Sequence, residues 1–290
     1  MPNPEHRRLP LAWITGAGGL IGNYLFHSAA KFAPDWRVRP LTRSDIDLAD
    51  APKVGALFRQ EQPNAIFHCA ALSKSPDCQA NPALARKLNV DVTIQLCELA
   101  RDIPFIFLSS DLVFDGRTGN YDETRPVNPL SVYAQTKVAA EHIVLSNPRH
   151  MVIRTSLNGG ISPSGDRGFN EQLRNAWHSG ETLRLFTDEF RCPIHAEVTA
   201  RAAWELLAKN QPGLYHVAGS ERLSRWQIGR LIASRSPQLH PKMVATSLKE
   251  YTGAPRSPDT SLNCAKAQKL LSFRIPGLTD WLASHPNELF

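Results

Sequence analysis

Several features of common protein classes are missing from this chain of 290 residues. No apolar run approaches the roughly 20 residues that span a bilayer, and residues 1–8 lack the apolar core of a signal peptide. The five cysteines are odd in number and widely spaced, without a C-x-x-C pair or a Cys/His cluster that would bind zinc. These absences predict a soluble, cytoplasmic protein with reduced cysteines, no membrane association and no metal site.

Basic charge is not concentrated in any one segment either. The net charge of +6 is moderate, and the arginines are scattered, so the chain has neither a basic stripe nor a recognition motif for nucleic acid. We therefore expect no nucleic-acid partner. A small anionic ligand accounts for the surplus charge equally well.

A glycine-rich turn near the N-terminus is the most informative feature that is present. Gly16, Gly19 and Gly22 follow the apolar run Leu9–Ile14, and a helical pattern continues over residues 20–32. Glycine permits positive φ and lets backbone amides approach a pyrophosphate, while the N-terminus of the following helix attracts an anion. The order of strand, turn and helix fits a dinucleotide site. Because the spacing differs from G-x-G-x-x-G, an ordinary tight turn stays open as the alternative.

Short apolar runs alternate with helical segments in the first half of the chain, which is typical of a parallel sheet covered on both faces. Pro40 is irregular within its predicted strand because proline donates no hydrogen bond. The pattern predicts a doubly wound α/β fold of the Rossmann type. The predicted strands are Leu11–Thr15, Arg37–Leu41, Ala65–Cys69, Phe105–Leu108 and Met151–Thr155, with helices near 20–33, 50–61, 82–101 and 130–146.

After residue 157 the pattern loosens into a glycine- and serine-rich connection, followed by short helices and strands. We predict a dinucleotide-binding domain over residues 1–157 and a smaller C-terminal substrate-binding lobe over 158–194 and 219–290. Residues 195–218 read as one more helix and strand, so we expect them to return to the first domain.

Two residues with acid-base chemistry share a face of the predicted helix at 130–146. Tyr133 and Lys137 are four positions apart. A lysine ammonium lowers the pKa of a nearby phenol, which makes tyrosine a better catalyst near neutral pH. Ser109 and Ser110 follow a predicted strand at the sheet edge where open α/β folds bind ligands. A solvated helix face and ordinary turn caps are the alternative explanations.

Together these motifs resemble the extended short-chain dehydrogenases/reductases and, within that superfamily, the dTDP-4-dehydrorhamnose reductase group. The similarity covers nearly the whole chain. The matching segments are T-G-x-x-G-x-x-G at 15–22, H-C-A-A at 68–71, L-N-V at 88–90, S-D-L-V-F-D-G at 110–116, Y-D-E-T at 121–124, Y-x-x-x-K at 133–137, R-T-S at 154–156 and G-L-Y-H at 213–216.

The resemblance implies a role for each catalytic residue. Tyr133 would give a proton to a carbonyl oxygen as hydride arrives from the nicotinamide, Ser110 would hydrogen-bond that oxygen, and Lys137 would hold the nicotinamide ribose and tune Tyr133. Asp47 would contact the adenine, although a helix cap remains its alternative role. The implied cofactor-binding residues are Gly16, Gly19, Leu20, Ile21, Gly22, Arg43, Asp47, Leu48, Ala70, Ala71, Tyr133 and Lys137.

The residues after the second predicted strand set the choice of cofactor. An acidic side chain at this place binds a ribose hydroxyl of NAD, and an arginine accommodates the 2′-phosphate of NADP. Thr42 and Arg43 occupy the place, and the first carboxylate is Asp45. This favours NADP(H), with NAD(H) as the second choice. A solvated surface arginine is the alternative reading of Arg43.

Departures from the family pattern lie on the substrate side. Leu112 replaces the aromatic residue that normally follows S-T-D, and Leu157 replaces the tryptophan that follows R-T-S. Arg191 stands where it would meet a diphosphate or, equally, stabilise the fold. The implied substrate-binding residues are Ser73, Ser110, Asp111, Leu112, Leu157 and Arg191.

We therefore predict an NAD(P)H-dependent reductase of a keto group on a nucleotide-linked or similar sugar. One alternative is an epimerase or dehydratase on the same scaffold, for which Asp111 offers the one carboxylate at the proton-transfer strand. Another is a non-catalytic NADP-binding regulatory subunit, because a relative of these reductases is the regulatory partner of methionine adenosyltransferase. The expected partner is a small molecule, and a homodimer is left open.

Overall fold

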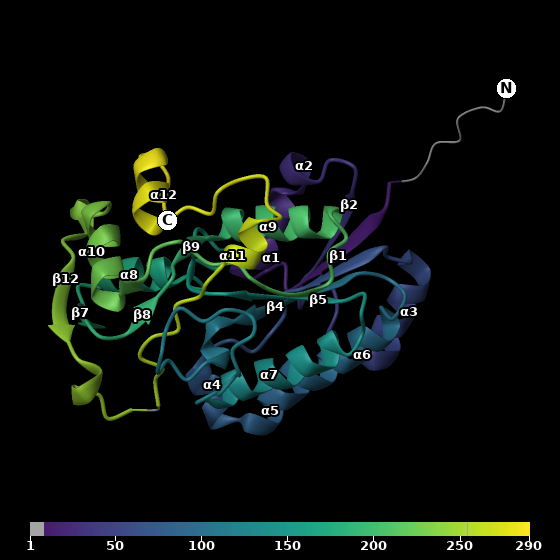
Figure 1. The fold of residues 1–290 in the computed structure, drawn as a ribbon, viewed down its shortest axis with the longest axis horizontal. Coiled ribbons are helices and arrows are strands. Elements are labelled where there is room, and N and C mark those ends of the chain that lie inside the picture. Colours follow the sequence, from purple (N-terminus) through teal and green to yellow (C-terminus); the bar gives the residue numbers. More distant parts are fainter. Residues whose placement is uncertain (1–8, 254) are drawn as a thin grey trace.

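The computed structural model describes residues 9–253 and 255–290, and a parallel β-sheet lies at its centre (Figure 1). Six strands form the sheet in the order β10-β5-β4-β3-β1-β2, and neighbouring strands are parallel. They are β1 (Leu11–Thr15), β2 (Arg37–Leu41), β3 (Ala65–His68), β4 (Phe105–Ser110), β5 (Met151–Thr155) and β10 (Gly213–His216). The chain runs from β1 outward to β2 and returns with β3 on the other side of β1, so the sheet is doubly wound. The predicted Rossmann-type α/β fold is confirmed.

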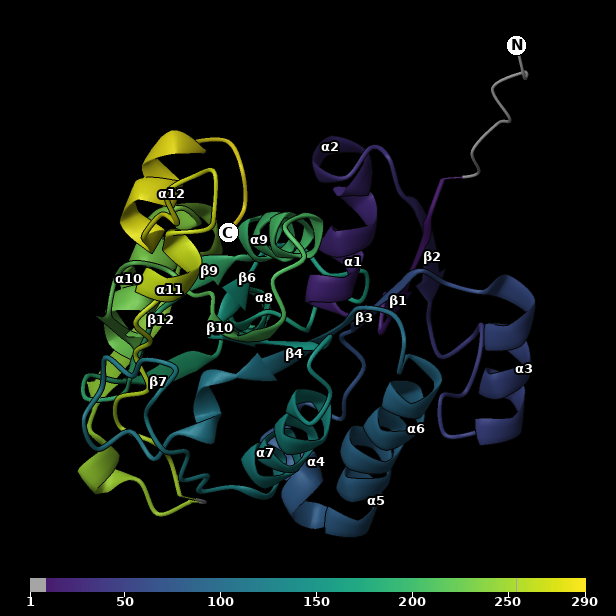
Figure 2. The same cartoon turned by 45° about the vertical axis from the view of Figure 1, so that its right-hand side comes forward.

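Helices cover both faces of this sheet (Figure 2). On one face lie α1 (Leu20–His27), α2 (Ala29–Phe32), α9 (Ala196–Ala208) and α11 (Ala265–Gln268); on the other lie α3 (Ala51–Glu61), α6 (Val92–Leu99) and α7 (Val132–Leu145). Within β1, Ile14 packs into the first layer and Trp13 into the second. Since both faces are buried, the central strands β1 and β3 are mostly apolar, whereas the outer strand β2 contains two arginines. In the described part of the chain, no helix has the length and apolarity to cross a membrane.

The structure explains the irregular Pro40 and differs from the predicted helices in two places. Pro40 lies in β2, the outer strand of the sheet, where a missing hydrogen-bond donor is tolerated. The single helix predicted over residues 82–101 is divided into α5 (Pro82–Arg86), a π-helical turn η1 (Lys87–Asp91) and α6. A short helix, α4 (Ser75–Ala80), was not predicted; Pro76 lies in its first turn, where proline costs no hydrogen bond.

A second apolar core lies beside the sheet and forms the lobe. It contains α8 (Phe169–His178), α10 (Arg225–Ser234) and α12 (Leu278–Ser284), with the two-stranded sheet β7 (Thr182–Phe186) and β12 (Lys242–Thr246). Its short elements are β6 (Asn158–Gly159), β8 (Phe190–Arg191), β9 (Ile194–His195), β11 (Leu223–Ser224), η3 (Pro237–Leu239) and η4 (Leu248–Glu250). Between these segments the chain returns to the main domain, because α9 packs on α1 and β10 pairs with β5. The exact domain boundaries stay a prediction.

Residues 256–262, here called the joining segment, contact both the main domain and the lobe. The Ser257 hydroxyl donates to the carbonyl oxygen of Phe114 at 2.9 Å. On the lobe side, the N–H of Phe190 donates to the carbonyl oxygen of Pro258 at 2.6 Å. The joining segment therefore connects the chain that follows β4 with β8.

Candidate active site

The turn between β1 and α1 packs directly against the end of β3. Gly16 has a φ of +70°, and a Cβ atom at this position would lie 2.6 Å from the main-chain nitrogen of Ala70. A Cβ atom at Gly22 would overlap the carbonyl oxygen of Gly16. Gly19 closes the turn by donating its N–H to that oxygen at 2.9 Å. Glycine is therefore required at positions 16 and 22 by contact between main-chain segments.

The N-terminus of α1 faces this turn without a cap from the described side chains. Its N-cap residue is Gly19, and its first turn, formed by Leu20, Ile21 and Gly22, contains no acidic residue. Uncapped N–H groups and the positive end of the helix dipole attract an anion. A tight glycine turn in front of such a helix end fits the diphosphate of a dinucleotide.

In the loop after β2, Arg43 is exposed, and the carboxylate of Asp45 is hydrogen-bonded to the loop itself. Asp45 accepts hydrogen bonds from the hydroxyl and the N–H of Thr42, at 2.5 and 2.9 Å, and these bonds lower the pKa of Asp45. Asp47 accepts a main-chain N–H two residues later at 3.0 Å, and the cap of α3 is Asp50 instead. The carboxylate closest to the end of β2 is thus bound within its own loop.

Asn89, in the π-helical turn η1, connects the loop after β3 with α7. Its side chain accepts the N–H of Leu72 at 2.7 Å and donates to the carbonyl oxygen of Leu72 at 3.0 Å. It also donates to the hydroxyl of Thr136 at 3.0 Å. Thr136 lies on α7 between Tyr133 and Lys137. Local π-helical geometry is frequent at functional sites, and here the buried amide of Asn89 contacts α7.

Tyr133 and Lys137 lie one turn apart near the N-terminus of α7. Ser131 caps this helix by accepting a main-chain N–H at 3.3 Å. Lys137 is 3% exposed, and its Nζ atom donates to the carbonyl oxygen of Leu108 on β4 at 2.6 Å. The same atom lies 3.9 Å from the ring centre of Phe107. The ammonium group is thus held near the carboxyl end of β4, on the side of the sheet where the parallel strands end.

Burial favours the uncharged form of both residues and shifts their pKa values in opposite directions. It raises the pKa of Tyr133, the charge of Asp111 raises it further, and a hydrogen bond with Ser110 opposes the rise. Burial also lowers the pKa of Lys137 to about 8, against the opposing charge of Glu141. The sequence predicts a lowered pKa for Tyr133, but burial and Asp111 raise it, so Tyr133 is protonated at neutral pH, as a general acid must be.

The two serines at the end of β4 have different partners. Ser109 is buried and donates to Oε1 of Glu141 at 2.5 Å. The Glu141 carboxylate also accepts two hydrogen bonds from Arg154 on β5, at 2.9 and 2.7 Å. Ser110 is half-buried and lies on the side of Tyr133. Ser109 is therefore part of a buried ion-pair network, whereas Ser110 borders the site.

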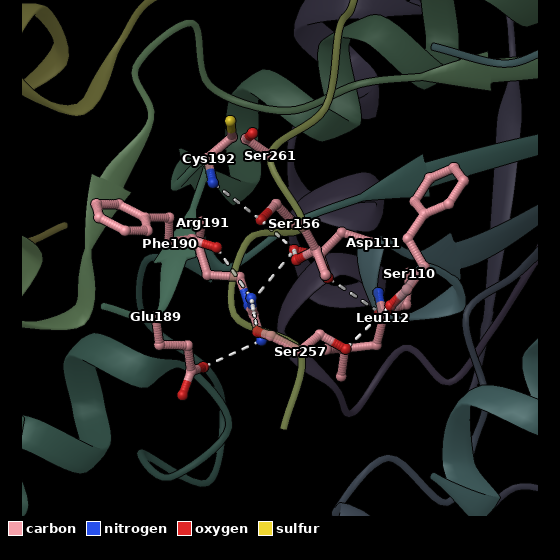
Figure 3. A network of polar contacts seen from close by, with 12 residues as sticks. Ser110, Asp111, Leu112, Ser156, Glu189, Phe190, Arg191, Cys192, Ser257 and Ser261 are labelled. Carbon is pink, nitrogen blue, oxygen red and sulfur yellow. Dashed lines mark hydrogen bonds and ion pairs between the residues drawn. The ribbon is translucent and has the colours of Figure 1, made fainter. Parts of the chain in front are cut away.

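Asp111 is a buried junction of several chain segments (Figure 3). It is 4% exposed, and its carboxylate accepts the hydroxyls of Ser110, Ser156 and Thr260 at 3.3, 2.6 and 2.9 Å. The Nε atom of Arg191 lies 3.7 Å from it. These partners come from β4, the end of β5, the joining segment and β8. The carboxylate is thus engaged by the protein itself.

Arg191 is buried as well. It is 2% exposed, its Nη2 atom lies 3.0 Å from Glu189, and its Nη1 atom donates to the carbonyl oxygens of Phe190 and Ser257 at 2.9 and 3.1 Å. Two roles were open for this residue from the sequence. Its contacts match the role of stabilising the fold, and they leave no exposed guanidinium edge for a diphosphate.

Glu189 has a central place that the sequence did not indicate. It is fully buried and also pairs with Arg225 and Arg256, at 3.0 and 2.6 Å. Burial alone would raise its pKa, but the three guanidinium groups lower the pKa of Glu189 to about 2. These arginines lie far apart in the sequence, so no local pattern indicates the cluster.

The remaining predicted residues border the ends of the strands. Leu112 follows β4 and donates its N–H to the Ser110 hydroxyl at 3.2 Å. Leu157 follows β5, and its side chain packs against the lobe core. On the loops after β2 and β3, Leu48, Ala70 and Ala71 are half-buried and Ser73 is exposed.

The doubly wound sheet, the glycine turn after β1 and the Tyr-Lys pair beside a strand-end serine define an NAD(P)-dependent reductase. Comparison with known proteins agrees with this class. A family model described as RmlD substrate binding domain matches residues 12–288. The chain belongs to this family.

Relatives match over most of their length. The chain is 28% identical to the probable low-salt glycan biosynthesis reductase Agl14 of Haloferax volcanii, over 94% of this chain and 96% of the relative. It is 29% identical to a dTDP-4-dehydrorhamnose reductase of Sinorhizobium fredii (91% and 92% covered) and 28% identical to methionine adenosyltransferase 2 subunit beta of Xenopus laevis (89% and 82%). A Bacillus anthracis dTDP-4-dehydrorhamnose reductase, solved in complex with NADP, superposes with a TM-score of 0.86 at 20% identity, covering 95% and 98%.

Proposed function

We propose that this protein reduces a keto group of a nucleotide-linked sugar with NADPH. One observation carries the proposal: Ser110 at the end of β4 and Tyr133 and Lys137 at the start of α7 converge at the sheet edge that also holds the glycine turn. Sugar reductases among the relatives support it. When bound, the cofactor would supply a hydride to the carbonyl carbon and leave as NADP⁺, and the proton that completes the alcohol would come from Tyr133.

Tyr133 is the proton donor in this scheme. Its phenol is protonated at neutral pH, and burial and the charge of Asp111 keep its pKa above the ordinary value. As negative charge develops on the carbonyl oxygen, the phenol transfers its proton there, and the Ser110 hydroxyl hydrogen-bonds the same oxygen. Lys137 places a positive charge one helical turn away, which stabilises the resulting phenolate. Asn89 holds Thr136, and with it this part of α7, against the loop after β3.

NADPH is the proposed cofactor because of the loop after β2. Arg43 is exposed there and would be free to meet a 2′-phosphate, whereas Asp45 is bound to Thr42 and less available to a ribose hydroxyl. The uncapped N-terminus of α1 receives the diphosphate, and Asp47 and Leu48 border the adenine. NAD(H) is the second choice.

The substrate sugar is proposed to lie between the ends of β4 and β5. Leu112 and Leu157 follow these two strands, and Ser73 borders the same edge from the loop after β3. Asp111 and Arg191 lie beneath this surface and shape it without reaching the ligand. With leucines instead of rings, this surface would favour a sugar that needs no aromatic stacking.

A reductase is favoured over a dehydratase or epimerase by the state of Asp111. A carboxylate that transfers protons has to reach the substrate, yet this one is 4% exposed and accepts three hydroxyl groups of the protein. A non-catalytic NADP-binding subunit is the remaining candidate, since methionine adenosyltransferase 2 subunit beta is a relative. The complete set of Ser110, Tyr133 and Lys137 favours catalysis. A homodimer also stays a prediction.

The test is NADPH oxidation, followed at 340 nm, with a panel of nucleotide-linked 4-keto sugars. We expect Tyr133→Phe to lower kcat by about 10²- to 10⁴-fold, because a general acid contributes that much, while the Kd for NADPH stays unchanged. Tyr251→Phe is the matched control, since Tyr251 is 41% exposed on the lobe. Equal turnover by Tyr133→Phe and the control contradicts the proposal. NADPH binding without turnover on any substrate favours the regulatory alternative.

A further inference from the structure

A chain of buried charges connects the lobe to the catalytic serine (Figure 3). Glu189 pairs with Arg191 at 3.0 Å, Arg191 lies 3.7 Å from Asp111, and Asp111 accepts the Ser110 hydroxyl at 3.3 Å. The side chains of Glu189, Arg191 and Asp111 are 0%, 3% and 5% exposed. Charges buried this deeply are stable only when they are paired and hydrogen-bonded, so the position of each group depends on the next.

We propose that Arg191 is a positioning residue for proton transfer: it compensates the charge of Asp111 beside Tyr133 and, itself paired with Glu189, holds β8 of the lobe against the end of β4. The catalytic meaning of this proposal rests on the proposed reductase function. The electrostatic effect of Arg191 on Asp111 and Tyr133 does not depend on that function, because the protein carries these charges whether or not it turns over a substrate.

Groups from several elements face Asp111 and Tyr133. The hydroxyls of Ser110, Ser156 and Thr260 contact Asp111, and Arg191 is its ion-pair partner. Cys192 directly follows β8, and the charge of Asp111 contributes to the raised pKa of its thiol. Around Tyr133 the groups are Ser110, Asp111 and Cys78 on α4, with Lys137 one turn along α7.

Two substitutions, one that removes a cation and one that removes an anion, distinguish an electrostatic role of Arg191 from a role in packing. Arg191→Met removes the cation and leaves Asp111 uncompensated, so the pKa of Tyr133 rises. Asp111→Asn removes the anion, keeps the size of the side chain and an acceptor oxygen, and lowers that pKa. A loss of packing alone would not move the pKa in opposite directions. The double variant Asp111→Asn/Arg191→Met removes both charges and returns the pKa toward the wild-type value.

The phenol of Tyr133 is titrated directly, in the full-length protein. Incorporation of 3,5-difluorotyrosine makes the phenols more acidic, and ¹⁹F NMR then follows their ionisation, with Tyr133→Phe identifying the resonance. We expect the midpoint to rise by about one pH unit in Arg191→Met and to fall by about one unit in Asp111→Asn, the size that a neighbouring charge produces.

Two further variants distinguish charge from packing. Arg191→Lys retains the cation and loses the paired Nη contacts, so its midpoint should stay near that of the wild type. Arg235→Met is the matched control: Arg235 also holds the lobe, but by donating to the carbonyl oxygens of Leu282 and Pro286 at the far end of α10. It should lower the melting temperature without moving the midpoint. If Arg191→Met does not fold, Arg191→Lys, Asp111→Asn and the double variant still measure the effect.

Turnover supplies a separate readout. We expect Arg191→Met to lower kcat about 10- to 100-fold with an unchanged Kd for NADPH, because the glycine turn is not part of this network. Midpoints that do not move, or that move in the same direction in both single variants, overturn the proposal. Midpoints that move as expected in a protein that reduces no ketone contradict the reductase function and leave the electrostatic role of Arg191 standing.

Discussion

At the cofactor end of the site, main-chain atoms of the turn after β1 approach α1 and the loop after β3 closely. At the other end, the proposed substrate end, buried charges join the end of β4, β8, α10 and the joining segment. Gly16 and Gly22 permit the first arrangement because no Cβ atom fits at either position. Asp111, Arg191 and Glu189 produce the second. The cofactor end therefore depends on shape, and the substrate end depends on ionisation.

This difference gives the two ends different sensitivities. A single added methyl group disturbs a backbone contact at any pH, because packing overlap does not titrate. A buried ion pair tolerates small changes of shape but loses its stabilising effect when one partner is neutralised. Each of the following experiments addresses one end and leaves the other intact.

The largest expected effect concerns Glu189 at the substrate end. Its replacement in Glu189→Gln leaves Arg191, Arg225 and Arg256 without their shared carboxylate. We expect the free energy of unfolding at pH 7 to fall by about 3–5 kcal/mol, as for a broken buried pair. Urea unfolding followed by circular dichroism measures it. Glu250→Gln, in an exposed pair with Arg184, is the control and should have a much smaller effect.

The same residue gives the substrate end a defined pH dependence. The pKa of Glu189 falls from an ordinary 4.5 to about 2 in the folded protein. A lowered pKa stabilises the fold fully above pH 4.5, and this contribution is lost as the pH falls through 2. Between pH 5 and 2 the wild type should lose about 3 kcal/mol more than Glu189→Gln. Parallel losses in the two proteins would show that Glu189 does not titrate as described.

At the cofactor end, Gly16→Ala tests contact between main-chain segments. Gly165 provides a matched control, because it has the same φ of +70° with open space around it. We expect Gly165→Ala to cost about 1 kcal/mol of stability from its backbone conformation alone, and Gly16→Ala about 1–3 kcal/mol more from overlap with Ala70. Thermal unfolding and NADPH titration measure both. Equal costs would mean that the turn does not rely on close approach.

The smallest expected effect concerns the choice of cofactor. Arg43→Gln should weaken NADPH binding about tenfold, corresponding to about 1.4 kcal/mol, and leave the Kd for NADH unchanged. Fluorescence titration with the two reduced cofactors measures it. Arg101→Gln is the control, since Arg101 is an exposed arginine beyond the end of α6. Equal weakening of both cofactors would argue against a 2′-phosphate contact.

The sequence predicts the local geometry of the glycine turn and of the start of α7, because the residues that determine it lie close together in the chain. The glycines at 16, 19 and 22 and the pair Tyr133 and Lys137 lie within single segments of strand, turn or helix, where spacing determines geometry. The apolar strands are equally local. Even the irregular Pro40 is explained once β2 is seen to be the outer strand.

The substrate end could not be predicted in the same way. Glu189, Arg225 and Arg256 meet only in the folded chain, and a glutamate near an arginine in sequence carries no sign of burial. The Tyr133 pKa shows the same limit. The local partner Lys137 predicts a lower value, but burial and Asp111, which arise from tertiary packing, raise it.

The joining segment is also made late during synthesis. Thr260, which contacts Asp111, and Arg256, which contacts Glu189, are translated after the last strand of the main sheet, β10. Because chains are made from the N-terminus, all six strands of the main sheet are synthesised before these partners, whereas α11, which covers one face of the sheet, is synthesised after them. The apolar cover of that face and the contacts of Asp111 and Glu189 are therefore completed by the same last part of the chain.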